Sequence, residues 1–132
     1  MEPALNQGTG NGSFLISKKG GFFLNSQYKK GVLELCVLSL LKKRDCYGYE
    51  ISEYLAGHID IADGTVYPLL RKMKADGLVT TYLQEESGGP PRKYYKLTQL
   101  GKDVYAMDRA EYLRFADTVR ELLKEDVEHE EA

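Results

Sequence analysis

The sequence is poor in the residues that support metal, disulfide and cofactor chemistry. Its 132 residues include no tryptophan, two cysteines and two histidines. Cys36 and Cys46 lack a CxxC spacing, so we expect reduced thiols, with a redox role for Cys46 at a turn as the less favoured alternative. His58 and His129 are far apart, and neither belongs to a metal-ligand pattern. These shortages argue against an enzyme, a metal site or a bound cofactor.

Long apolar runs are missing as well. Met1–Leu24 has no continuous apolar segment like that of a signal peptide, and no run reaches the roughly 18 apolar residues that cross a membrane. We therefore expect a cytoplasmic protein without a membrane partner. A chain of 132 residues is expected to form one small domain that buries about two thirds of its unfolded surface, enough for a hydrophobic core.

The net charge of −2 conceals an uneven distribution along the chain. Residues 28–99 carry 11 basic and 9 acidic side chains, whereas residues 100–132 carry 5 basic and 10 acidic side chains. Exposed charges farther apart than about 8 Å are largely screened at physiological salt. The acidic C-terminal segment therefore leaves the field of a basic surface in the middle of the chain intact.

Composition and periodicity divide the chain into four segments. Residues 1–27 are rich in glycine and polar residues and hold too little apolar surface to order, so a disordered arm is predicted. Residues 28–97 are predicted to form a winged helix-turn-helix DNA-binding domain, residues 98–125 a long C-terminal helix, and residues 126–132 an acidic tail that frays. The expected fold class is mainly α, with one small antiparallel β-hairpin.

Two helices are expected before the basic segment. Apolar residues in the segment 28–44 cover most of a helical circumference, which predicts a helix that is buried on nearly every side and also contacts a partner subunit. A second helix is expected over 47–56, with Gly57 as its stop. The segment 58–62 is expected to be a short linker strand.

The third helix is expected to present a basic face. Asp63 is its expected cap and Asp76 ends it. The apolar positions that share one face are Val66, Leu69, Leu70 and Met73. The candidate recognition residues on the opposite side and flank are Thr65, Tyr67, Pro68, Arg71, Lys72 and Lys74. Such a face suits contacts with phosphates and base edges, although an ordinary solvated helix would carry similar charges.

A β-hairpin is expected directly after this helix. Leu78–Glu85 and Arg92–Leu97 are rich in threonine, valine and tyrosine, and the Ser-Gly-Gly-Pro-Pro between them is strong turn chemistry. Arg92 and Lys93 lie at the hairpin tip, where two cations can grip a phosphate backbone or enter a minor groove. Charge can also serve to protect an edge strand. The basic helix just before the hairpin favours the DNA interpretation.

The last helix is expected to join two chains. Thr98 is its expected cap, and at about 1.5 Å per residue it reaches about 40 Å, which exceeds the domain. Asp108 interrupts the first heptad, so no long regular coiled coil is expected. The apolar residues predicted to form a homodimer are Tyr105, Tyr112, Phe115, Val119 and Leu122. Packing of the helix on its own domain alone is less favoured because the helix is too long.

Four ordered motifs resemble the successive signatures of the PadR family of transcriptional regulators. They are Tyr47-Gly48-Tyr49-Glu50-Ile51, Gly64-Thr65-Val66-Tyr67-Pro68-Leu69-Leu70, Asp76-Gly77-Leu78-Val79 and the segment from Gly89 to Gly101. The resemblance extends over roughly residues 28–123, and only the glycine-rich arm departs from it.

The resemblance implies a homodimeric winged helix-turn-helix repressor of a nearby promoter, joined through its C-terminal helix and bound to double-stranded DNA. It also implies that Thr65, Tyr67 and Arg71 lie on the recognition helix and that Arg92 and Lys93 lie on the wing. Some small members of this family respond to phenolic or multidrug-type ligands.

A small aromatic effector is the weaker part of this hypothesis. Met107, Tyr112 and Phe115 could provide walls for a flat apolar molecule, but core or dimer packing accounts for the same side chains. The absence of tryptophan also removes an indole wall. The alternative to a DNA-binding regulator is a winged-helix protein-interaction module whose long helix recruits a different partner, which would leave the isolated chain monomeric.

Overall fold

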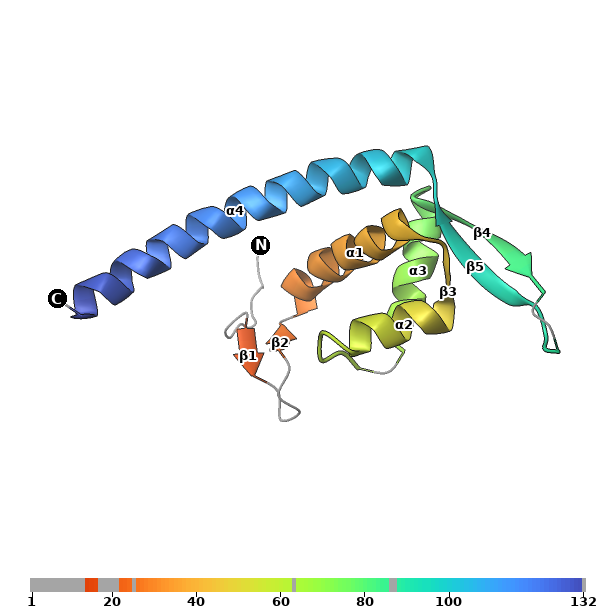
Figure 1. Cartoon of the computed structure of the whole chain (residues 1–132), viewed down its shortest axis with the longest axis horizontal. Coiled ribbons are helices and arrows are strands. Elements are labelled where there is room, and N and C mark those ends of the chain that lie inside the picture. Colours follow the sequence, from red (N-terminus) through yellow and green to blue (C-terminus); the bar gives the residue numbers. More distant parts are fainter. Residues whose placement is uncertain (1–13, 17–21, 25, 63, 86–87, 132) are drawn as a thin grey trace, which may run out of the picture.

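A computed structural model describes residues 14–16, 22–24, 26–62, 64–85 and 88–131 of the chain. The helices in this part are α1 (Ser26–Lys43), α2 (Gly48–Ala56), α3 (Val66–Ala75) and α4 (Gln99–Glu131). The strands are β1 (Phe14–Ile16), β2 (Phe22–Leu24), β3 (Cys46–Tyr47), β4 (Val79–Gln84) and β5 (Arg92–Leu97). The fold is therefore mainly α with a small antiparallel sheet, as the sequence predicts (Figure 1).

The hydrophobic core lies between α1, α2, α3 and the β3–β5–β4 sheet. Its buried members are Leu33, Val37, Leu38, Leu40, Leu41, Cys46, Ile51, Leu55, Val66, Leu70, Met73, Leu78, Val79, Tyr95 and Leu97. Each fully buried leucine or isoleucine contributes roughly 1.5–3 kcal/mol. In α3 the predicted inward face is confirmed, because Val66, Leu70 and Met73 are buried and Leu69 packs at the margin of the core. This packing fixes which side of α3 faces outward.

The wing is a hairpin with a third, very short strand added to it. Strands β4 and β5 pair from Val79–Leu97 to Gln84–Arg92, as the turn chemistry between them predicts. Strand β3 pairs with β5 on its other edge, which the sequence analysis did not predict. Cys46 of β3 is fully buried, and burial raises the pKa of its thiol. The structure thus leaves no exposed thiol at Cys46 for a redox role.

Helix α4 leaves the wing at a sharp junction. The Thr98 hydroxyl donates to the Gly77 carbonyl oxygen at 2.6 Å and accepts from the Gly101 N–H at 3.0 Å, so Thr98 caps α4 as predicted. The helix then runs beside α1 in the opposite direction and continues past it (Figure 1). No helix in the described part of the chain is both long and apolar enough to cross a membrane.

Three boundaries differ from the sequence predictions. Helix α4 extends to Glu131, whereas residues 126–132 were predicted to fray; no glycine or proline interrupts this segment, and glutamate is a good helix former. Helix α3 starts at Val66 rather than just after Asp63. The predicted cap Asp63 and the last residue of the predicted tail, Ala132, lie outside the described residues. The segment 58–62 is a loop and not a strand.

The N-terminal segment also differs from its prediction. Residues 1–27 were predicted to be disordered, but β1 pairs with β2 in an antiparallel hairpin and α1 already begins at Ser26. Each strand is a run of three apolar residues, a local pattern that the polar composition of the whole arm conceals. The rest of the predicted arm lies outside the described residues.

Candidate DNA-binding surface

The outward face of α3 carries the side chains predicted to contact DNA. Tyr67, which is 43% exposed, lies on the first turn of the helix, and Arg71 follows one turn later. The other exposed members are Pro68, Lys72 and Lys74, while Thr65 at the cap position is half-buried. The helix therefore presents an aromatic ring and cations together on its solvent side.

The cations of α3 differ in their availability to a ligand. Lys72 Nζ lies 2.7 Å from Asp76 Oδ2 and 4.0 Å from Glu34 Oε1, and the hydrogen bond to Asp76 raises the pKa of Lys72. Lys74 Nζ donates to Thr81 Oγ1 at 3.1 Å. Arg71, in contrast, forms no hydrogen bond or ion pair with any residue that the structure describes. Arg71 is consequently the most available charge of the helix.

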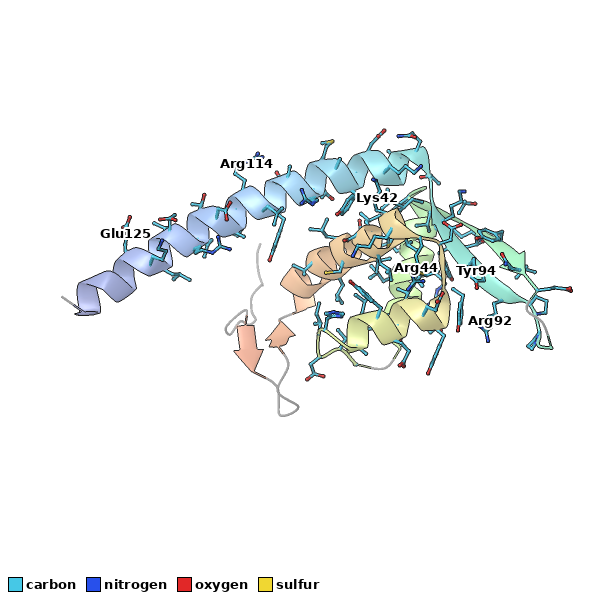
Figure 2. All side chains as sticks on the ribbon, in the orientation of Figure 1. Lys42, Arg44, Arg92, Tyr94, Arg114 and Glu125 are labelled. Atoms are coloured by element: carbon cyan, nitrogen blue, oxygen red, sulfur yellow. The ribbon has the colours of Figure 1, made fainter. Side chains whose placement is uncertain are left out.

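The two wing cations lie at the outer end of the β4–β5 ladder. Arg92 pairs with Gln84 and Lys93 with Leu83, and both cations are exposed. The Arg92 guanidinium carbon lies 4.5 Å from the centroid of the Tyr47 ring, which places the cation over an aromatic face. Figure 2 shows Arg92 and Tyr94 on the same strand, near the start of α2. The predicted wing pair therefore occupies the predicted position.

A pocket of about 290 Å³ joins the wing to the two helices of the helix-turn-helix. Its lining residues are Tyr47, Gly48, Tyr49, Tyr67, Arg92, Lys93 and Tyr95. Burial and the neighbouring Tyr67 raise the pKa of Tyr95, and the nearby Arg71 charge partly offsets this effect. The predicted recognition residue Tyr67 and the predicted wing cations therefore share one concave surface.

The start of α2 contributes residues that the sequence analysis did not assign to the site. Tyr49 is 59% exposed and Tyr47 and Gly48 line the same pocket. The Tyr47 N–H donates to Glu50 Oε1 at 3.1 Å, and Arg44 Nη1 lies 3.2 Å from Glu50 Oε2, so the strand-to-helix junction is held by local polar contacts. The sequence signal for these residues is the Tyr-Gly-Tyr-Glu motif, which carries part of the family resemblance.

The candidate dimer surface lies on α4. Tyr105 packs against the core of its own domain, and Tyr112 and Val119 are half-buried. Phe115 and Leu122 are 59% and 61% exposed although they continue the apolar side of the helix. Met107 is 72% exposed, so an effector pocket with Tyr112 and Phe115 would need walls from a second chain. The distal part of α4 thus presents an uncovered apolar surface.

Among the described residues, no group of three or more histidine, cysteine, aspartate and glutamate side chains is arranged to hold a metal ion.

Comparisons with known proteins agree with this architecture. Residues 37–107 match the model of the transcriptional regulator PadR-like family. A crystal structure of a PadR-like transcriptional regulator from Bacillus cereus is 37% identical with a TM-score of 0.68, over 74% of this chain and 97% of that chain. A PadR-like transcription factor from Bacteroides fragilis is 39% identical with a TM-score of 0.61, over 73% and 94%. A transcriptional regulator of Mycobacterium tuberculosis is 26% identical over 84 residues, 63% of this chain and 78% of that protein.

Proposed function

The chain belongs to the PadR-like family of transcriptional regulators, which are DNA-binding proteins and not enzymes, and we propose that it acts as a homodimeric repressor at a specific operator. One observation carries this proposal: the exposed ring of Tyr67 on α3 and the cations Arg92 and Lys93 on the wing line the same concave surface. A helix and a wing that face one way can engage a major groove and the adjacent backbone together.

We assign different roles to the cations of this surface. Arg71 reads base edges, because no residue in the described part of the chain bonds to it and a guanidinium can donate two hydrogen bonds to guanine. Lys93 contacts the phosphate backbone. Lys72 and Lys74 contribute charge but less direct contact, because Asp76, Glu34 and Thr81 already engage them.

The proposed dimer forms through α4. At about 1.5 Å per residue its 33 residues extend about 50 Å. The exposed side chains of Phe115 and Leu122 support association with a second copy, because burying them removes apolar surface from water. With two chains related by a two-fold axis, the recognition helices would enter successive major grooves about 34 Å apart, so the operator is an approximate inverted repeat.

An aromatic effector is part of the same proposal. Met107, Tyr112 and Phe115 would line its site in the dimer, and its binding would change the spacing of the two α3 helices and release the operator. The exposure of Met107 and Phe115 in a single chain supports a shared site.

Two measurements test the proposal. Gel shift at low salt should show that the protein retards DNA from upstream of its own gene more strongly than an unrelated duplex of equal length, and equal retardation would refute a specific regulator. Sedimentation of the free protein should give a dimer. A monomer that assembles only with another protein would favour the protein-interaction module.

A further inference from the structure

Three tyrosines form a row across the outer face of the wing sheet. Tyr47 of β3 and Tyr82 of β4 are the direct cross-strand partners of Tyr94 of β5. Alternate residues of a strand point to opposite faces, so the row lies opposite the buried pair Cys46 and Tyr95. The rings of Tyr82 and Tyr94 are 5.6 Å apart and nearly parallel at 15°, and those of Tyr94 and Tyr47 are 5.5 Å apart at 58°. The rings therefore form one continuous aromatic array.

A charged group lies at each end of the row. The Tyr82 hydroxyl donates to Asp45 Oδ2 at 2.7 Å. At the other end, the Arg92 guanidinium carbon lies over the Tyr47 ring, 4.5 Å from its centroid. Asp45, which directly precedes β3, is thus connected through three rings to a cation at the outer end of β5.

This arrangement leaves Arg92 able to bind an anion. A cation–π contact uses none of the N–H donors of a guanidinium, and these donors can reach two oxygens of a phosphate. Arg92 forms no ion pair with any residue that the structure describes. An arginine that is already ordered loses less rotamer freedom when it binds.

The pocket beside Arg92 has the composition of an anion site. It adds the ammonium group of Lys93 and the phenols of Tyr49 and Tyr67, and no carboxylate is among its lining residues. Tyr47, Gly48 and Tyr49 of its lining lie at the N-terminal end of α2, where the helix dipole favours negative charge and the Glu50 carboxylate already caps the first turn. The pocket of about 290 Å³ has room for a phosphate group beside two cations and the tyrosine side chains of its lining.

We propose that this pocket is a preformed binding site for one phosphate of the nucleic-acid backbone. Asp45 and Tyr82 are positioning residues that hold Arg92 at the edge of this phosphate site through the tyrosine row. The proposal rests on the proposed function, since the phosphate belongs to the bound DNA. The pocket would add a contact to the DNA backbone that requires residues of the wing and of both helices together.

A first test uses inorganic pyrophosphate and the free protein, and so does not depend on an operator. Titration followed by ¹H–¹⁵N NMR should move the amide signals of Gly48, Tyr49 and Lys93 more than those elsewhere in the domain. Arg92→Gln should abolish these shifts. Lys96→Gln removes an exposed cation from the same strand, away from the pocket, and should leave them unchanged.

A second test measures the salt dependence of binding to a 20-bp duplex. Arg92→Gln should weaken binding about tenfold and reduce the slope of log K against log[salt] by about 0.9, the contribution of one phosphate. Tyr82→Phe keeps the stacked ring but removes the hydrogen bond to Asp45. It should therefore cause part of the loss of affinity and part of the decrease in salt slope. In the Arg92→Gln background it should have no further effect, because the two residues act through one contact. Asp45→Ala should lower the duplex affinity, and Asp45→Asn, which retains a hydrogen-bond acceptor, should restore it.

The outcomes separate the two proposals. If pyrophosphate shifts only the amide signals of the pocket and the protein binds no duplex, the phosphate site is supported and the DNA-binding function is refuted. If the protein binds the duplex but pyrophosphate shifts amide signals outside the pocket, the phosphate site is refuted and the DNA-binding function stands. Additive effects of Tyr82→Phe and Arg92→Gln on duplex binding would have the same meaning. Tyr82→Phe preserves the aromatic packing, so it remains informative if Asp45→Ala does not fold.

Discussion

The ring of Tyr67 lies so close to Gly48 that a β-carbon at position 48 would be 2.7 Å from Tyr67 Cε1. The first turns of α2 and α3 therefore meet at the pocket, and the absence of a side chain at Gly48 sets where the Tyr67 ring can lie. Since Tyr67 is 43% exposed, its ring can move outward when the contact becomes too close.

Gly48→Ala should displace the Tyr67 ring without destabilising the fold. The atoms that the added β-carbon would meet belong to the outer end of the Tyr67 side chain, which can move, so the unfolding free energy should change little. DNA affinity should fall about threefold to tenfold, because a positioned contact is lost. Fluorescence anisotropy and thermal unfolding measure the two quantities.

Gly57→Ala is the matched control at the other end of α2. Its added β-carbon would meet only ordinary contacts, 3.5 and 3.6 Å from the carbonyl oxygens of Glu53 and Tyr54. DNA affinity should be unchanged. Equal losses in both variants would mean that α2 as a whole, and not the Gly48–Tyr67 contact, is responsible.

Gly101→Ala should have the opposite profile, with a large effect on stability. A β-carbon at Gly101 would clash with the carbonyl oxygen of Leu78, and backbone cannot move aside as a side chain can. We expect a loss of roughly 1–3 kcal/mol in the free energy of unfolding, measured by urea denaturation. The neighbouring exposed Lys102→Ala should cost less than about 0.5 kcal/mol. An unchanged free energy of unfolding in Gly101→Ala would contradict a rigid junction between the wing and α4.

The sequence predicts those parts of this architecture that depend on local periodicity. The inward face of α3, the turn that joins β4 to β5 and the Thr98 cap are each set by residues close to one another in the sequence. The tyrosine row could not be predicted in this way, because it requires that β3 pair with β5. The same holds for the contact of Lys72 with Glu34, which comes from α1. Contacts between distant segments depend on the packed core, and no local pattern encodes them.

Tyr82 should ionise at a higher pH than an ordinary tyrosine. Its hydrogen bond to Asp45 is lost on ionisation, and this raises the pKa of Tyr82 from 10.0 to about 12. The folded state is therefore favoured while Tyr82 is protonated; this contribution is fully present below pH 10 and disappears as the pH rises through about 12. The chain has no tryptophan, so absorbance at 295 nm follows tyrosinate alone.

Two variants identify the group that ionises. Tyr82→Phe should remove the late step from the titration, and Asp45→Ala should shift it toward pH 10. A late step that persists in Tyr82→Phe would assign it to another tyrosine and contradict the Asp45–Tyr82 contact.

Phe115→Asp should separate the two chains of the proposed dimer without unfolding the domain. Phe115 is 59% exposed in the single chain, so the thermal midpoint of the domain should change little, whereas a charge in the buried centre of an interface should weaken association more than about tenfold. Sedimentation across a concentration series measures this. Ala110→Asp lies roughly 140° around the helix from Phe115 and should leave the dimer intact. Unchanged association of Phe115→Asp would exclude this side of α4 as the interface.

Arg71→Ala and Lys93→Ala should weaken DNA binding in different ways. Loss of Arg71 should cost about 1–3 kcal/mol at the operator and relax the sequence preference, because a base-edge contact disappears. Loss of Lys93 should weaken all duplexes alike and lower the salt slope by about one. Anisotropy with specific and unrelated duplexes distinguishes them, and equal losses on both duplexes for Arg71→Ala would make Arg71 a phosphate contact only.

Selection of duplexes from a random library by the purified protein, followed by sequencing, tests the central claim most directly. The proposed dimer should enrich an inverted repeat whose half-sites are centred about one helical turn apart, and Arg71→Ala should enrich the same repeat with degenerate positions in each half. Recovery of no common sequence, or of a single half-site without its inverted copy, would contradict a dimeric reader of a specific operator.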